Sequence, residues 1–492
     1  MLFTRLEFLW LFLATFALYY LPGLRRLQVG VLLAASLVFY GWHSPELLVL
    51  LALSIAINAI TSFQASRTGS RTRLAWASAG VVANLLVLGF FKYGALLTQL
   101  AVKVMHLPQE GLVLTLMQLP LPIGISFYTF EGISLLVDVL KGRVRELDHR
   151  PGERGAFTRH LANTSLFIAF FPHLIAGPIL KASHFYPQIG RKSFSAIRWD
   201  IVARSLVTGY FMKMVIADNL KDYTFWLTYP YCLSVGTLTG LALLFGYAMQ
   251  IFADCAGYSL IAIGLAAILG YELPPNFNFP YIADSLSDFW RRWHISLSTW
   301  LRDYLYFPLG GNRNGALMTY FNLLLVMALG GLWHGAAWSY MVWGCYHGLG
   351  LALERLATQT LGARLPSTAN WPRVARAFVK GLRIMGVFVF VSLGWLLFKL
   401  TDIRHVAEFL LMLTQKTSVH ANIEQTSAVA LYSLPVLFWH ALHLPSVQRW
   451  KRDFHRSFPR VNDRSEDLFH GVMVAAIILN SGTSNAFIYF QF

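Results

Sequence analysis

The feature that most constrains this chain is the recurrence of apolar stretches from one end to the other. A helix rises about 1.5 Å per residue, so roughly 20 apolar residues cross the ~30 Å hydrocarbon core of a bilayer. Some of the stretches are short or interrupted, and they cover residues 7–24, 28–42, 45–63, 75–100, 234–253, 315–333, 335–353, 384–400, 428–445 and 471–480. We therefore predict an all-α polytopic membrane protein with about 10–12 transmembrane helices.

The composition agrees with a membrane protein rather than a soluble one. Of the 492 residues, 56% are hydrophobic and only 13% are charged, whereas soluble globular chains carry about 25% charged residues. The longest polar stretches, about 20 residues, are too short for a soluble core of their own. We predict a single membrane domain over residues 1–492, with its core motifs in 120–355 and peripheral C-terminal helices in 376–492.

The net charge of +16 comes from short basic loops between the apolar stretches. Basic residues gather in this way on the cytoplasmic side of membrane proteins and set their orientation. Membrane lipid is therefore the expected surroundings and no nucleic acid is expected as partner, although an anionic ligand of one loop remains an alternative. The loops are 67–73, 141–159, 191–192, 291–313, 364–383 and 449–464.

Proline-rich motifs interrupt the apolar pattern in three places, at residues 119–128, 171–178 and 273–280. Proline lacks a backbone donor and clashes with the preceding turn, so each motif should break or kink a helix. Broken backbone at membrane depth persists only where protein or water satisfies the freed groups. The motifs predict re-entrant or half-helices around a cavity. A transporter would share them, so they do not decide the function.

His334 is the strongest candidate for chemistry, because apolar sequence lies on both sides of it. An ionisable group in such surroundings is costly unless it has a function or a partner. A neutral imidazole takes up the proton of a hydroxyl as that hydroxyl attacks a carbonyl. Nearby Gly330, Gly331 and Gly335 allow a backbone or ligand to approach closely. The alternative is a histidine that is hydrogen-bonded inside a helix bundle.

A second histidine, His294, lies in an amphipathic segment rich in arginine and tryptophan. The alternative interpretation is that His294 is a surface histidine stacked on tryptophans. Arginine binds phosphate through two parallel hydrogen bonds, so the arginines of this segment are candidates to hold the phosphates of a donor, with membrane-surface anchoring as the alternative. Acidic residues are candidates to orient a histidine or an arginine. The arginines are Arg291, Arg292 and Arg302, and the acids are Asp254, Asp288 and Asp303.

Metal chemistry is not expected from this sequence. His294 and His334 are too far apart in sequence to show the close ligand spacing of zinc sites, and His347 is expected to pack or cap. The three cysteines, Cys232, Cys255 and Cys345, also lack ligand spacing and are interpreted as packing residues.

Several motifs taken together resemble the membrane-bound O-acyltransferase family, and in particular its bacterial branch that acetylates alginate. The resemblance covers roughly residues 1–355 and the extreme C-terminus. The matching motifs are Pro122 to Tyr128, Phe171 to Pro178, Asn276 to Tyr281, Phe289 to Leu305, Gly310 to Arg313, Gly330 to Gly335 and Phe487 to Phe492.

This resemblance implies a ring or horseshoe of transmembrane helices around a central tunnel. It implies that His334 is the catalytic residue and His294 a second functional histidine. Trp293, Trp333 and Asn312 lie in matching motifs and join the arginines and acids as supporting or donor-binding candidates. The implied donor is cytoplasmic acetyl-CoA, with no permanently bound cofactor. The implied setting is the bacterial inner membrane, with a periplasmic SGNH-type partner and a polysaccharide acceptor.

One motif departs from the family pattern. The family's Tyr-Phe-Asp-Phe-Ser-Gly-Tyr-Ser is here Phe252-Ala-Asp-Cys-Ala-Gly-Tyr-Ser259, and Leu260 stands where the family has a further aspartate. This change bears on the substrate more than on the reaction type. D-alanyl transfer towards teichoic acid and acylation of a lipid or protein remain alternatives on the same fold. A transporter or polysaccharide-export subunit is the alternative from another class, but the chain has few acidic residues within its spans and no internal repeat.

Overall fold

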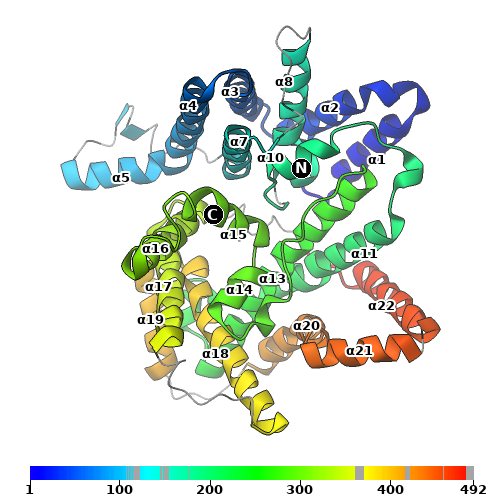
Figure 1. Ribbon diagram of the computed structural model, residues 1–492. Coiled ribbons are helices and arrows are strands. Elements are labelled where there is room, and N and C mark those ends of the chain that lie inside the picture. The colour runs from blue at the N-terminus through cyan, green and yellow to red at the C-terminus, as the bar shows by residue number, and fades with distance from the viewer. Residues whose placement is uncertain are drawn as a thin grey trace. The chain divides into compact units, whose positions relative to one another are not determined.

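The computed structural model describes residues 1–106, 108, 110, 111, 113, 114, 122–144, 147, 155–175, 177–360, 371–415, 422–457 and 459–483. Within these ranges every regular element is a helix and there is no strand, which confirms the all-α prediction (Figure 1). The matching C-terminal motif, residues 487–492, lies outside the described residues.

The chain divides into two compact units. The first comprises Met1–Leu206 and Ile261–Pro274, and the second comprises Val207–Leu260 and Pro275–Phe492. The single domain over 1–492 and the ring around a tunnel stay predictions.

The first unit is built around α3, which packs against α4, α7 and α8. Its helices are joined by buried polar contacts, as expected where no water competes. The Asn58 and Asn84 amides donate to each other's oxygens at 3.1 and 2.9 Å. The helices of this unit are α1 (Leu6–Tyr20), α2 (Gln28–Gly41), α3 (Leu47–Arg67), α4 (Ser70–Leu88), α5 (Gly94–Met105), α7 (Ile125–Leu140), α8 (Ala156–Ala169), α9 (Phe171–Leu174) and α10 (Ala182–Phe185), followed by most of α11 (Trp199–Tyr210).

The proline-rich motifs at 171–178 and 273–280 separate helices, as predicted, whereas residues 119–121 of the first motif lie outside the described residues. The clearest case is 171–178, where α8 ends and α9 lasts only one turn before a buried non-helical stretch. Glu131 on α7 satisfies part of this stretch, because its Oε1 accepts from Leu180 N at 3.4 Å and lies 3.0 Å from His173 Nδ1. A buried carboxylate thus replaces the hydrogen bonds that the helix would have supplied.

The second unit contains the rest of the chain. Its most extensive helix–helix contact is between α16 and α17 (Figure 1). Helix α20 bends by 74° into α21. The helices are α12 (Asp218–Thr224), the first part of α13 (Thr237–Ile268), α14 (Leu286–Arg292), α15 (Ile295–Leu301), α16 (Gly315–His334), α17 (Trp338–Thr360), α18 (Arg373–Lys399), α19 (Ile403–Gln415), α20 (Ile423–Leu442), α21 (Pro445–Ser457) and α22 (Pro459–Leu479).

Among the described residues, six helices are long and apolar enough to cross a membrane, or seven if α20 and α21 form one bent span. This is fewer than the 10–12 predicted, for reasons visible in particular stretches. The apolar stretch 7–24 folds as α1, which has only 15 residues. The stretch 471–480 is only the end of α22, whose first half is polar. Apolar length in sequence therefore overstates the number of long apolar helices.

Glycines allow α16 and α17 to meet backbone to backbone. A Cβ on Gly344 would lie 2.1 Å from the carbonyl oxygen of Met327, and one on Gly331 would lie 2.1 Å from that of Tyr340. Neither backbone carbonyl can move aside as a flexible side chain would. Small residues at such crossings are typical of helix pairs in membranes.

We expect Gly344→Ala to destabilise the protein by about 1–3 kcal/mol, because the added methyl group overpacks this contact. The measurement is the unfolding temperature of the purified protein in detergent. Gly386→Ala is the matched control, since a Cβ at Gly386 on α18 meets nothing within 4 Å. Equal unfolding temperatures for the two variants would contradict the close-packing argument.

Candidate active site

The structure brings the two predicted histidines together. His334 is the last residue of α16, and His294 immediately precedes α15. Their ring centroids are 6.3 Å apart, and the two residues are 5% and 4% exposed. Trp333 contacts both rings, at centroid distances of 5.0 Å from His334 and 5.8 Å from His294. Both imidazoles are thus buried, and both contact the ring of Trp333.

A clamp from a distant motif holds the turn that carries His294. The His294 backbone is left-handed, with a φ of 43°, which is a strained conformation for a residue other than glycine. Asn276 Oδ1 accepts hydrogen bonds from Ser296 N at 3.1 Å and from Ser296 Oγ at 2.9 Å. The Asn276 carbonyl oxygen accepts from Ile295 N at 2.8 Å. This clamp gives a structural reason for the motif that begins at Asn276.

Burial keeps the His294 ring neutral. It lowers the pKa of the imidazole to about 3, because the charged form would lose its hydration. A neutral imidazole offers one N–H donor and one acceptor nitrogen. His294 is therefore suited to hold and orient a neutral polar group.

His334 differs from His294 because it lies at the carboxyl end of a helix. The last carbonyls of a helix carry partial negative charge, which favours a positive charge nearby. The rings of Trp343 and Phe398 meet the imidazole edge-on, at centroid distances of 5.4 and 5.1 Å. The position suits a histidine that becomes positively charged when it takes up a proton.

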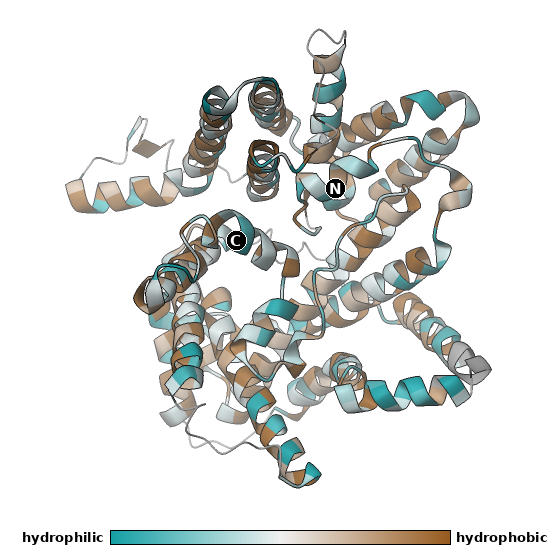
Figure 2. Cartoon of the chain, viewed as in Figure 1, coloured by the Kyte–Doolittle hydropathy of each residue, from teal (hydrophilic) through white to brown (hydrophobic). Residues whose placement is uncertain are grey.

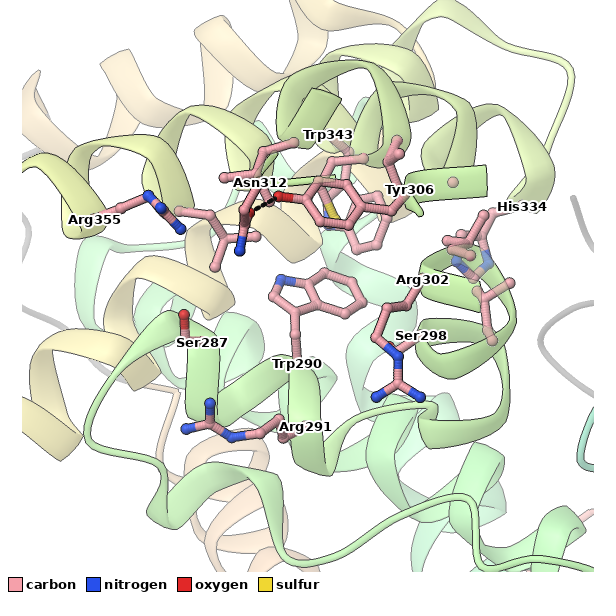
Figure 3. A pocket seen from close by; sticks show the side chains of 17 residues that line it. Ser287, Trp290, Arg291, Ser298, Arg302, Tyr306, Asn312, His334, Trp343 and Arg355 are labelled. Carbon is pink, nitrogen blue, oxygen red and sulfur yellow. Dashed lines mark hydrogen bonds between the residues drawn. The ribbon is translucent and has the colours of Figure 1, made fainter. Parts of the chain in front are cut away.

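His334 lines one end of a pocket of about 430 Å³ that is walled by α14, α15, α16 and α17. Much of the lining is apolar, and none of the described lining residues is acidic. Three arginines line it: Arg291, Arg302 and Arg355. In Figure 3, Arg291 and Arg355 lie on one side of Trp290, with Arg302 and His334 on the other. The pocket therefore combines cationic groups with an apolar stretch leading to a histidine.

The three arginines differ in how far their charge is already neutralised. Arg302 Nε donates to Asp303 at 2.7 Å, and Arg291 lies 3.6 Å from Asp288. Arg355 makes no ion pair within the described part of the chain, and its buried Nε has no hydrogen-bond partner there. Arg355 is thus the cation of the pocket best placed to receive an anion.

The sequence analysis missed Arg355, although a signal for it existed. Trp343, Leu351 and Arg355 are spaced by multiples of four residues on α17 and all line the pocket, and such residues share one helix face. It also missed Glu354, whose carboxylate accepts from Leu286 N at 2.5 Å and Ser287 N at 3.1 Å. Through these bonds Glu354 holds the start of α14 against α17.

Of the other predicted site residues, only Asn312 lines the pocket, and it accepts a hydrogen bond from Tyr306 (Figure 3). Asp288 and Arg292 pair with each other on α14 at 2.7 Å, outside the lining. Trp293 packs in the core, with its ring centroid 4.8 Å from that of Trp395. His347 is fully buried behind the pocket wall, 4.9 Å from Trp343 between ring centroids.

Asp254 does not line the pocket but belongs to a separate buried ionic cluster. Lys213 Nζ donates to Asp254 at 2.8 Å and to Asp218 at 2.7 Å. The Lys213 ammonium also lies 5.3 Å from the centre of the Tyr258 ring. The motif around Asp254 is thus explained by the anchoring of Lys213, in the π-helical segment Phe211–Ala217.

An all-helical membrane chain with a histidine at one end of an arginine-lined pocket fits an enzyme that transfers acyl groups within a membrane. The family "MBOAT, membrane-bound O-acyltransferase" matches residues 78–429. The chain therefore belongs to the membrane-bound O-acyltransferase family. It is a multi-pass membrane protein and an O-acyltransferase.

Curated relatives of the chain carry related names. It is 39% identical over 413 residues to a probable alginate O-acetylase of Pseudomonas aeruginosa, covering 82% of this chain and 73% of the relative. It is 33% identical over 399 residues to a peptidoglycan O-acetyltransferase of Helicobacter pylori, covering 77% and 72%. It is 31% identical over 235 residues to a teichoic acid D-alanyltransferase of Bacillus subtilis, covering 46% and 56%.

We expect Lys213→Met to cost about 3–5 kcal/mol of stability, because it leaves two buried carboxylates without their ammonium. Asp218→Asn combined with Lys213→Met should recover part of the loss, since it removes one of these carboxylates. The unfolding temperature in detergent measures both effects. A Lys213→Met protein as stable as wild type would show that the ionic cluster does not support the fold.

Proposed function

We propose that this protein transfers an acetyl or other short acyl group from a cytoplasmic thioester, acetyl-CoA, towards the hydroxyls of an extracytoplasmic polysaccharide. The observation that carries the proposal is the placement of His334 at one end of a pocket lined by three arginines. Alginate or a similar exopolysaccharide is the proposed acceptor, which the named activity of the Pseudomonas aeruginosa relative supports.

The pocket matches the two ends of an acyl-CoA. Its phosphates suit the guanidinium groups of Arg291 and Arg355, at the end away from His334, because a planar fork of donors binds phosphate oxygens in pairs. The apolar lining suits the pantetheine arm and the acyl group. With the phosphates at the arginines, the thioester carbonyl is brought towards His334.

The proposed reaction is a direct acyl transfer. His334 accepts the proton of the attacking hydroxyl as the new C–O bond forms at the thioester carbonyl, and the imidazolium gains from its place at the end of α16. The C–S bond then breaks, and His334 returns the proton to the departing thiolate to give the free thiol. His294, neutral and 6.3 Å away between ring centroids, orients the hydroxyl or the carbonyl.

The proposed setting is the bacterial inner membrane. The basic loops support a cytoplasmic entrance for the donor, because such loops stay on the cytoplasmic side. We further propose that a periplasmic SGNH-type protein completes transfer to the polysaccharide. Reconstitution of the chain with and without such a partner, followed by measurement of polysaccharide acetylation, tests this part separately.

D-alanyl transfer is a second candidate, which the similarity to a teichoic acid D-alanyltransferase supports. The two functions differ in the donor. A D-alanylated carrier thioester that is consumed faster than acetyl-CoA by the purified protein would favour the second function.

We expect His334→Gln to lower turnover at least about 100-fold, because glutamine cannot take up the proton. The assay is release of labelled acetyl groups from acetyl-CoA by protein in nanodiscs, with the partner present. His43→Gln, at an exposed position outside the site, is the matched control. Unchanged turnover in folded His334→Gln protein would exclude His334 as the catalytic residue. A wild-type protein that consumes no acetyl-CoA would exclude this donor.

We expect Arg355→Gln to raise the KM for acetyl-CoA about tenfold while kcat changes little, because it removes a charged hydrogen bond to the donor and no group at the reacting carbonyl. Arg313→Gln is the matched control, since Arg313 is exposed and does not line the pocket. Equal KM values for the two variants would argue against phosphate binding at Arg355.

A further inference from the structure

A second basic depression lies in the same unit, away from the histidines. It has a volume of about 880 Å³ and is formed by the start of α18 and the corner between α20 and α21. We call it the basic groove. Four cationic side chains line it, Arg373, Arg376, Lys380 and Arg449, together with apolar residues such as Ile384 and Leu444. The acyl-transfer site shares none of these residues.

The charge of the basic groove is poorly compensated within the protein. None of the described lining residues is acidic, and the carboxylate nearest to Lys380, that of Asp284, is 4.0 Å away, at the limit of an ion pair. No carboxylate pairs with Arg373, Arg376 or Arg449 in the part of the chain that the structure describes. Four cations thus share one depression, where an anion would relieve their mutual repulsion.

Three of these cations lie at the start of α18, where the helix itself adds to the uncompensated positive charge. Arg373, Arg376 and Lys380 occupy the first turns of the helix. The amino end of a helix carries partial positive charge, so cations there are unfavourable and an anion is favoured. Helix polarity and side-chain charge therefore act in the same direction at this groove.

The basic groove lies at one end of the long apolar helix α18 and at the bend between α20 and α21. Helix α18 continues into an apolar span, and α20 turns by 74° into α21 at the corner that lines the groove. Figure 2 shows hydrophilic residues along α21 and at the start of α18, followed by more hydrophobic residues along α18. An amphipathic helix at a sharp angle to a span is suited to lie along the membrane surface.

Exposed aromatic and aliphatic side chains lie on other faces of the two helices that form the groove. Trp450 on α21 is 63% exposed and stacks on Phe454 with a centroid distance of 5.3 Å. On α18, Phe378 and Leu382 are 66% and 57% exposed. Tryptophan and phenylalanine at such positions contact the headgroup and upper acyl region of a bilayer. The groove itself offers cations for a headgroup beside an apolar lining that includes Ile384 and Leu444.

We propose that the basic groove is a binding site for the headgroup of an anionic phospholipid. The phosphate lies among Arg376, Lys380 and Arg449, and the acyl chains begin at the apolar part of the groove lining, at Ile384 and Leu444. Charge complementarity selects an anionic lipid over a zwitterionic one, because each basic residue near an anionic headgroup adds to the attraction. A role in membrane orientation alone needs the same charges but does not need them to converge on one depression.

The test compares lipid binding to the full-length protein in detergent by native mass spectrometry. Phosphatidylglycerol is titrated against phosphatidylcholine of the same chain length. The groove variant is Arg376→Gln/Lys380→Gln/Arg449→Gln. The matched control is Arg383→Gln/Arg452→Gln/Arg456→Gln, which removes the same charge from the same two helices at residues that do not line the groove. Soluble glycerol phosphate is added as a competitor in a separate arm.

We expect wild type to bind phosphatidylglycerol about tenfold more tightly than phosphatidylcholine, the control variant to keep this preference, and the groove variant to lose it. An equal loss of the phosphatidylglycerol preference in both variants would overturn the proposal, because the total charge of the two helices would then explain the preference without a site. No preference in wild type, or no loss in the groove variant, would overturn it as well. Displacement by an equal concentration of glycerol phosphate would identify a site for free anions instead of a lipid.

The triple variant must fold for this comparison, so its unfolding temperature is measured first. If it does not fold, the single variants Arg449→Gln and Arg452→Gln form the matched pair, and only Arg449→Gln should weaken phosphatidylglycerol binding, by about fivefold. Equal binding by the two single variants would overturn the proposal. None of these measurements uses acyl-transfer activity, so their outcome is independent of the proposed reaction.

Discussion

The close contact between α16 and α17 is the constraint on which the candidate active site depends. The two backbones meet at Gly331 and Gly344, where even a methyl group would overlap a carbonyl oxygen. This contact fixes how His334, at the end of one helix, faces Trp343 on the other. Because α17 also carries Arg355, the same contact sets the separation between the cationic and the histidine ends of the pocket.

Hydrogen-bonding side chains then fix the segments that the α16–α17 pair does not hold. Asn276 holds the turn of His294, and Glu354 ties α14 to α17. Neither residue lines the pocket, yet each determines where lining residues lie. The hydrogen bonds of Asn276 are buried, so no water competes with them, and they position a short, irregular segment that packing alone would leave loose.

The helical fold and the two histidines were predictable because their signals are local or lie in recognisable motifs. Apolar length and composition predict a helical membrane protein, and the motifs around His294 and His334 predict a shared site. The number of spans was less predictable, because an apolar run does not mark where a helix ends; α1 ends at Tyr20, ahead of Pro22, although the predicted apolar stretch runs to Leu24.

The remaining side chains of the site depend on long-range geometry. Arg355 faces the pocket because α17 folds back along α16; its spacing from Trp343 and Leu351 puts the three on one helix face, but not on a face known from sequence to meet a pocket. For the same reason Asp254, predicted as a supporting residue, could not be assigned to Lys213 from sequence, since its partner comes from another segment. Trp293 and Arg292 lie in a matching motif, but α14 lines the pocket with the face that carries Ser287, Trp290 and Arg291, and neither Arg292 nor Trp293, which follows the helix, lies on that face.

The left-handed backbone at His294 has a consequence for mutagenesis. Among residues other than glycine, asparagine and aspartate adopt this conformation most readily, whereas alanine is strained there. An alanine at this position would therefore disturb the turn as well as delete the ring, and its phenotype would mix the two effects. Asparagine would keep the turn while removing the imidazole, so only the pair of substitutions separates the role of the backbone from that of the ring.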